Sequence, residues 1–300
     1  MGRNGVLQLG LLLSLKVFFA IVKIRRWAVV SEKLSELIRL LDIEKVEENL
    51  FIANHPEGRT GRLYGGQIMA QALMGAIRTV PDDRYVHSIH GYFLRPGNPK
   101  TPAIIRVERL RDGGSFSTRR VIVQQEGRPI FTLDASFQIE EESFNHQFEI
   151  PEELEPPAPE KIPEYLLKEP FLSWRHEFRR LQSNSPQPPE QYVWIKANGE
   201  VPADRSLQTC LLVFESDNVL LGTCRLPHRG SYERDNMQVA SLDHAMWFHR
   251  PVRVDQWLLY DVQGPTLSGS RGLVTGRFFT EQGVLVASTT QEGLVRDTRA

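Results

Sequence analysis

The sequence predicts an α+β fold in which one unit, a buried helix packed against an antiparallel sheet, occurs twice. Residues 86–96 and 241–251 lie 155 positions apart and end in the same aromatic-Phe-x-Arg-Pro pattern. Each half also contains one helix-type apolar run followed by several strand-like runs, and an acidic, proline-dense stretch separates the halves. A repeat this long indicates a duplicated domain rather than a solenoid of short repeats.

The first half is predicted to be a helix, a strand, a second helix and then a meander of strands. Ser31 is a suitable N-cap for a helix whose apolar residues fall at positions 34, 37, 38, 40 and 41. After Gly65-Gly66, the run Ile68–Ile77 is rich in small residues, which predicts a buried helix that a sheet approaches closely. Glu126-Gly127 predicts a hairpin turn. The expected strands are 46–53, 84–94, 103–112, 115–125 and 130–139.

The second half repeats this order after a linker. The segment 151–163 is too rich in proline for a helix or a central strand, whereas 164–182 is amphipathic and predicts a surface helix. We therefore divide the chain into an N-terminal extension, an N-terminal unit, a linker and a C-terminal unit, at 1–30, 31–150, 151–190 and 191–300. The last unit is expected to contain a strand at 192–196, a helix at 204–217, and strands near 237–247, 257–263, 272–280 and 284–290.

The composition is that of an ordinary globular protein. The 300 residues are 41% hydrophobic and 24% charged, and the net charge of −1 does not indicate a nucleic-acid partner. Cys210 and Cys224 form no CxxC pair, so neither a zinc site nor a disulfide framework is expected. Motifs for dinucleotides, phosphate loops and zinc hydrolases are absent, and we expect no cofactor. The sequence also lacks the Gly-x-Ser-x-Gly motif of α/β-hydrolases.

The N-terminal segment differs in character from the rest. Residues 6–22 are apolar but contain Gln8 and Lys16, which makes them short and costly as a membrane span. The basic flank that follows does not suit a signal-peptide cleavage site. We expect residues 1–29 to lie outside the working domain, as the product of a miscalled start, with a membrane anchor or organelle-targeting segment as the alternative. The C-terminus lacks a Ser-Lys-Leu-type peroxisomal signal, so a cytoplasmic location is expected, and no stable membrane association is expected for residues 31–300.

A metal site near the second repeat motif is not expected. Asp243, His244 and His249 are potential ligands, but strand alternation would place Asp243 and His249 on the face of Ser241 and His244 on the opposite face. The three side chains would then not converge.

Five separated motifs occur in order along the chain: Gly65-Gly-Gln67, Val86–Pro96, Arg111–Ser117, Ser241–Pro251 and Gln291-Glu-Gly293. Together they resemble the acyl-CoA thioesterase II family of bacterial enzymes and the eukaryotic peroxisomal thioesterase. The resemblance extends from Ser31 to Arg296 and implies a double hotdog fold, in which each of two repeats wraps a central helix in an antiparallel sheet. It also implies hydrolysis of fatty acyl-CoA of medium to long chain.

The resemblance assigns the catalytic roles to Asp217 at the end of the second central helix, Ser241 two residues before an Asp-His pair, and Gln291 in the last strand. These residue types suit the reaction, because thioester hydrolysis needs a water molecule held and deprotonated beside the carbonyl carbon. An acyl-enzyme on Ser241 is the alternative to direct attack by water, although no histidine or lysine partner is evident. Taken singly, each residue could instead be structural: a helix-end carboxylate, a strand-edge hydroxyl or a surface amide.

Two further pairs are weaker candidates for substrate binding. His87 and His90 lie three positions apart on one predicted strand and face opposite sides, so at most one of them lines a site. Gly65 and Gly66 begin the first buried helix, where backbone N–H groups could face a phosphate or a carbonyl oxygen, although a structural role is favoured.

The hotdog fold also allows two alternative functions, and it predicts that the protein self-associates. A hotdog enoyl-CoA hydratase or dehydratase would need an Asp/His pair on one central helix, and the helix at 204–217 contains no histidine. A non-catalytic acyl-CoA-binding module would be expected to lack one of the three catalytic residue types. A homodimer or homotetramer is expected, because hotdog sheets expose edge strands that neighbouring subunits cover.

Overall fold

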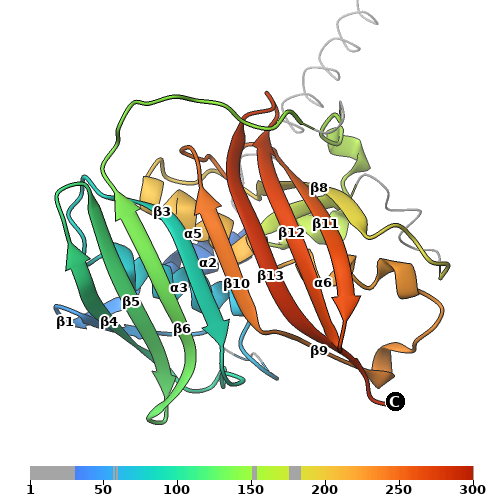
Figure 1. Cartoon of the computed structure of the whole chain (residues 1–300), viewed down its shortest axis with the longest axis horizontal. Coiled ribbons are helices and arrows are strands. Elements are labelled where there is room, and N and C mark those ends of the chain that lie inside the picture. Colours follow the sequence, from blue (N-terminus) through green and yellow to red (C-terminus); the bar gives the residue numbers. More distant parts are fainter. Residues whose placement is uncertain (1–30, 57, 59, 151–153, 176–183, 300) are drawn as a thin grey trace, which may run out of the picture.

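The computed structural model describes residues 31–56, 58, 60–150, 154–175 and 184–299 (Figure 1). The predictions for the N-terminal segment 1–29 lie outside the described residues. Within the described ranges, no helix is both long enough and apolar enough to cross a membrane.

Within the described residues, the strands form one continuous antiparallel sheet of 13 strands. Their order is β1-β2-β4-β5-β6-β3-β10-β13-β12-β11-β8-β7, with β9 paired to one end of β13. The first half contributes β1 (Glu44–Glu47), β2 (Leu50–Ala53), β3 (Tyr85–Phe93), β4 (Ala103–Asp112), β5 (Phe116–Gln125) and β6 (Arg128–Gln138). The second half contributes β7 (Phe171–Arg175), β8 (Glu190–Ala197), β9 (Met237–Ser241), β10 (Asp243–Phe248), β11 (Leu258–Ser268), β12 (Arg271–Thr280) and β13 (Leu285–Asp297).

The two halves of the sheet meet where β3 pairs with β10. His90 lies opposite Ala245 in this ladder, and these two residues are also equivalent by the sequence offset of 155. A residue paired with its own equivalent marks an approximate two-fold axis between the repeats. The structure is thus a double hotdog, and the predicted α+β fold with two helix-and-sheet repeats is confirmed.

The helices lie on one face of this sheet, behind it in the view of Figure 1. The central helices are α3 and α5, which pack against each other and against apolar residues of both halves in one continuous core. The predicted N-cap is confirmed, because the Ser31 hydroxyl accepts a hydrogen bond from the Leu34 N–H at 3.1 Å. The helices are α2 (Glu32–Leu41), α3 (Gly65–Ile77), α5 (Arg205–Ser216) and α6 (Leu220–Thr223), with 3-10 turns at Pro159–Lys161, Glu164–Lys168, Leu226–His228 and Arg234–Asn236.

The two central helices run in opposite directions, so that the start of α3 lies beside the end of α5. The Tyr64 hydroxyl, next to the start of α3, donates to the Phe214 carbonyl near the end of α5 at 3.0 Å. A Cβ atom added to Gly66 would lie only 2.2 Å from the same carbonyl oxygen. The glycine therefore permits the close approach of the helices, as the small residues of this run predict.

Three predicted elements differ from the observed ones. The segment 46–53 belongs to a short hairpin, β1–β2, rather than to a single strand, and the strand predicted at 237–247 is interrupted at Leu242. The surface helix predicted over 164–182 is wrong for its described part, which forms a 3-10 turn and then β7. Pro170 separates the two, and β7 buries Phe171 and Leu172 while pairing with β8, so that pairing with the sheet overrides the amphipathic pattern.

Candidate active site

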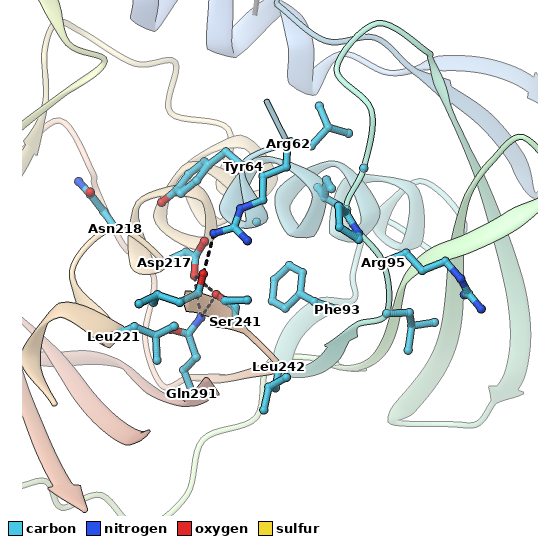
Figure 2. A pocket seen from close by; sticks show the side chains of 18 of the residues that line it. Arg62, Tyr64, Phe93, Arg95, Asp217, Asn218, Leu221, Ser241, Leu242 and Gln291 are labelled. Carbon is cyan, nitrogen blue, oxygen red and sulfur yellow. Dashed lines mark hydrogen bonds between the residues drawn. The ribbon is translucent and has the colours of Figure 1, made fainter. Parts of the chain in front are cut away.

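A pocket of about 520 Å³ opens where the start of α3, the end of α5 and the strand β9 meet (Figure 2). Residues of both halves line it, including three arginines, whereas Asp217 is the only acidic residue among the described residues of its wall. The apolar part of the wall comprises Leu63, Ile68, Phe93, Leu94, Leu221, Val239, Ala240 and Leu242. A volume of this size and a mixed apolar and cationic lining suit a ligand that has both an acyl chain and anionic groups.

The three predicted catalytic side chains converge on the wall of this pocket (Figure 2). Asp217 is the C-cap of α5, Ser241 is the last residue of β9, and Gln291 lies in β13. The Gln291 Nε2 atom donates to Asp217 Oδ1 at 2.6 Å, and the Ser241 hydroxyl donates to the same oxygen at 3.4 Å. Gln291 Nε2 also lies 3.3 Å from Ser241 Oγ. The helix end and the two strands thus bring together residues up to 74 positions apart in the chain.

The glycines of α3 contact this group from the other half of the protein. The Gly66 N–H donates to Asp217 Oδ2 at 3.1 Å, and a Cβ atom on Gly65 would lie 2.7 Å from that oxygen. A side chain at Gly65 would collide with the carboxylate, and one at Gly66 would collide with the Phe214 carbonyl, so both positions require glycine. The backbone N–H that the sequence offered to a phosphate or carbonyl oxygen binds the carboxylate of Asp217 instead.

Burial changes the acidity of this carboxyl group. Loss of solvent raises the pKa of Asp217 from 3.8 to about 6, although the hydrogen bonds from Gln291, Gly66 and Ser241 and the charge of Arg62 lower it. The carboxylate form still predominates at neutral pH. A proton acceptor whose pKa lies this close to neutrality is well matched to general-base chemistry.

His244 also joins this group, contrary to the prediction that it points away. The ring is fully buried, and its Nδ1 and Nε2 atoms lie 3.1 Å from Gln291 Nε2 and Ser216 Oγ, respectively. The prediction assumed an uninterrupted strand, but the pairing with β13 shifts by one residue between Ser241 and Ala245. Such a shift exchanges the two faces of a strand. The interruption at Leu242 has no local sequence signal that would have revealed it.

Asp243 and the two weaker histidine candidates lie elsewhere. Asp243 Oδ2 lies 3.1 Å from His90 Nε2, and its Oδ1 accepts from the Glu292 N–H, so that both side chains lie away from the pocket. His87 binds the Ser136 hydroxyl at 2.9 Å and lines a second pocket at the other end of the central helices. The structure therefore does not bring His87 or His90 to the pocket of Asp217. Among the described residues, no cluster of three or more His, Cys, Asp or Glu side chains could hold a metal ion.

The second pocket, of about 460 Å³, is the pseudo-symmetric counterpart of the first. Arg78 is the C-cap of α3, in the position that Asp217 has at the end of α5. The sequence offset places Val86 at the position of Ser241, and the strand pairings place Ala135 at that of Gln291. One end of the helix pair therefore has the three polar groups, and the equivalent positions at the other end have none of them.

Comparisons with known proteins agree with this site and fold. A family profile described as "Acyl-CoA thioesterase" matches residues 171–294, and one described as "Acyl-CoA thioesterase N-terminal domain" matches residues 55–138. The chain is 38% identical to human acyl-coenzyme A thioesterase 8 over 282 residues, which cover 86% of this chain and 88% of the human protein. It is also 38% identical to acyl-CoA thioesterase 2 of Haemophilus influenzae, covering 89% of this chain and 99% of that protein.

Two solved structures also resemble this chain in both fold and sequence. The crystal structure of an acyl-CoA thioesterase II from Mycobacterium marinum matches with a TM-score of 0.76 and 40% sequence identity, covering 87% of this chain and 98% of that one. The tesB protein of Mycobacterium avium subs paratuberculosis matches with the same TM-score of 0.76 and 29% identity, covering 88% of this chain and 100% of that one.

Proposed function

The chain belongs to the acyl-CoA thioesterase II family and hydrolyses acyl-CoA thioesters, and we propose that Asp217, Ser241 and Gln291 form its catalytic group. The observation that carries this proposal is their mutual hydrogen bonding in the wall of a pocket that is large enough for a substrate. The reaction is the attack of water on the thioester carbonyl carbon, giving a free fatty acid and CoA.

In this mechanism, Asp217 accepts a proton from the attacking water while Ser241 and Gln291 hold that water in place. The oxygen–carbon bond forms, the carbonyl π electrons move to the oxygen, and the tetrahedral intermediate collapses with cleavage of the C–S bond. The leaving group is a thiolate, whose conjugate thiol has a pKa of about 8.5, so its departure requires no strong acid. The proton held by Asp217 then passes to the thiolate or to solvent. The positive end of the α3 dipole, at Gly65 and Gly66, stabilises negative charge in this region.

The pocket lining supports a fatty acyl-CoA as the substrate. Its apolar side chains form a surface for an acyl chain, and the size of the pocket is consistent with medium to long chains. Arg62, Arg95 and Arg225 place positive charge around the same opening, where the phosphates of CoA would be attracted.

Direct attack by water is favoured over an acyl-enzyme on Ser241. Within the described residues, the Ser241 hydroxyl is hydrogen-bonded to Asp217 and Gln291, and no histidine or lysine contacts it to accept its proton. A hydratase or dehydratase reaction is disfavoured because α5 contains no histidine. Assembly into a dimer or tetramer and a cytoplasmic location stay predictions from the sequence.

The test is the release of CoA from acyl-CoA esters of increasing chain length, followed by thiol titration. We expect wild-type protein to turn over, and Asp217→Ala to lose at least about a hundredfold in kcat, the scale of a positioned acid or base. Asp243→Ala is the matched control, because its carboxylate is 26 positions away and faces His90 rather than the pocket. Equal activity of wild type and Asp217→Ala would refute the site. A burst of CoA release matched by an acylated Ser241 would refute direct attack by water.

A further inference from the structure

His244 is a buried histidine whose ring lies directly behind the proposed catalytic group. It is fully buried in β10, and both ring nitrogens have partners on the elements that supply the catalytic group. Nε2 lies 3.1 Å from the hydroxyl of Ser216, the residue that precedes Asp217 on α5. Nδ1 lies 3.1 Å from the amide nitrogen of Gln291 on β13. The imidazole therefore bridges the helix and the strand that present Asp217 and Gln291.

The hydrogen-bond partners determine which ring nitrogen carries the proton. Gln291 must direct its NH₂ group toward Asp217 Oδ1, because a carboxylate oxygen only accepts hydrogen bonds. The same NH₂ group faces Nδ1 of His244, so Nδ1 must be an unprotonated acceptor. The proton then lies on Nε2 and is donated to Ser216 Oγ, whose own hydrogen is donated to the Val213 carbonyl at 2.8 Å. The two N–H bonds of Gln291 are then directed to Asp217 Oδ1 and His244 Nδ1, and the contact of its nitrogen with Ser241 Oγ, at 3.3 Å, is the longest of the three.

We propose that His244, as the neutral Nε2–H tautomer, is a positioning residue that fixes the orientation of the Gln291 amide toward Asp217. The inference rests on the proposed function, because it concerns how one member of the catalytic group is held. With both N–H bonds of Gln291 engaged, its Oε1 is the one amide atom without a partner among the described residues. That oxygen is buried, so the contribution of the amide to the site is the hydrogen bond that its NH₂ group donates to Asp217.

The opposite orientation of the amide is disfavoured for two reasons. It would place Oε1 against the Asp217 carboxylate, where two acceptors repel, and it would require the proton on Nδ1 of His244. The Ser216 hydroxyl would then have to donate to Nε2 and would lose its hydrogen bond to the Val213 carbonyl. Burial lowers the pKa of His244 to about 3, which is consistent with a neutral ring throughout the working pH range.

The test compares two substitutions of His244 that fill the site differently. His244→Leu removes both hydrogen bonds, whereas the side-chain oxygen of His244→Asn can still accept from Gln291. We expect His244→Leu to lose about tenfold to a hundredfold in kcat with little change in KM, the range found when a group that orients a reactive ligand is removed. We expect His244→Asn to recover part of that loss. His249→Leu is the matched control, since His249 follows the far end of β10, where it binds Ser288 and lines the second pocket.

A double-mutant cycle with Gln291→Ala separates positioning from a general loss of structure. We expect His244→Leu to have no further effect on kcat once Gln291 is replaced, because the residue acts through that amide. Independent, multiplying losses would overturn the inference while leaving the proposed function intact. Full activity of Gln291→Ala alone would instead refute the proposed function.

Nitrogen-15 NMR of the wild-type protein tests the tautomer without any variant, in case His244→Leu does not fold. Long-range proton–nitrogen correlations of the ring should show a protonated Nε2 and an unprotonated Nδ1 at about pH 7, where a neutral ring is expected. An Nδ1–H tautomer or an imidazolium would overturn the inference.

Discussion

Replacing Asp217 by asparagine is predicted to stabilise the protein at neutral pH while removing its activity. Burial raises the pKa of this carboxyl group from 3.8 to about 6, so the ionised form opposes folding. This rise in pKa corresponds to about 3 kcal/mol, which is an upper bound because the side chain lines an open pocket. The substitution Asp217→Asn also replaces one accepting oxygen by an amide donor and loses a hydrogen bond from Gly66 or Gln291, at a cost of about 1 kcal/mol. The net expectation is a gain of about 1–2 kcal/mol.

The stabilisation by Asp217→Asn, measured as the increase in the free energy of unfolding, should grow as the pH rises. Since the folded-state pKa of Asp217 lies above its unfolded value, the wild-type carboxyl group favours folding below about pH 4, and this contribution is lost as the pH rises through 6. Asparagine does not titrate. The advantage of Asp217→Asn in the free energy of unfolding should therefore be largest at about pH 8 and shrink as the pH falls from about 6 toward 4.

Urea unfolding of wild type and Asp217→Asn at about pH 8 and about pH 5, with CoA release measured in parallel, tests this expectation. Asp243→Asn is the matched control: Asp243 pairs with His90 and accepts from the Glu292 N–H, so its replacement should bring no gain at the higher pH. The reasoning is refuted if Asp217→Asn is less stable than wild type at the higher pH, or if its advantage is the same at the lower one.

Three further expectations follow from the same site. The kcat/KM of the wild type should fall with decreasing pH below about 6, as a single group, because the base must be ionised; a flat profile from about pH 5 to 8 would contradict a role for Asp217 as the base. In thermal or urea unfolding, Gly66→Ala should destabilise the protein by at least about 2 kcal/mol relative to Gly114→Ala, because its Cβ atom would meet the facing helix backbone whereas Gly114 has open space. Arg95→Gln combined with Arg225→Gln should raise the KM for acyl-CoA severalfold but not that for an acyl-pantetheine thioester, and an equal rise for both would argue against phosphate binding.

The sequence was sufficient to predict most of the fold, because its local signals agree with the tertiary structure. The helix capped by Ser31, the buried small-residue helix and the Glu126-Gly127 turn are all present, the last with positive φ at both residues. The local sequence signals gave a wrong prediction where pairing with a neighbouring strand determined the secondary structure. At 171–175 an amphipathic segment pairs with β8 as a strand, a choice that depends on residues far away in the chain.

The candidate site was predictable in residue type but not in its supporting contacts. The resemblance pointed to Asp217, Ser241 and Gln291, yet the alternation argument placed His244 on the wrong face. A one-residue shift in pairing at Leu242 reverses every side chain that follows, and it depends on how β9 and β10 each meet β13. The contact of Gly66 with Asp217 likewise joins the two repeats and could not be inferred from either repeat alone.

The duplication also explains why the two ends of the helix pair differ. In a symmetric pair of repeats, each end would combine the start of one central helix with the end of the other. Here the end of α5 supplies Asp217, whereas the equivalent end of α3 supplies Arg78, whose guanidinium pairs with Asp42 at 2.5 Å outside the second pocket. The first half contributes Gly65 and Phe93 to the pocket that has the polar groups, and the Gly66 N–H to Asp217, so neither repeat would form this site alone.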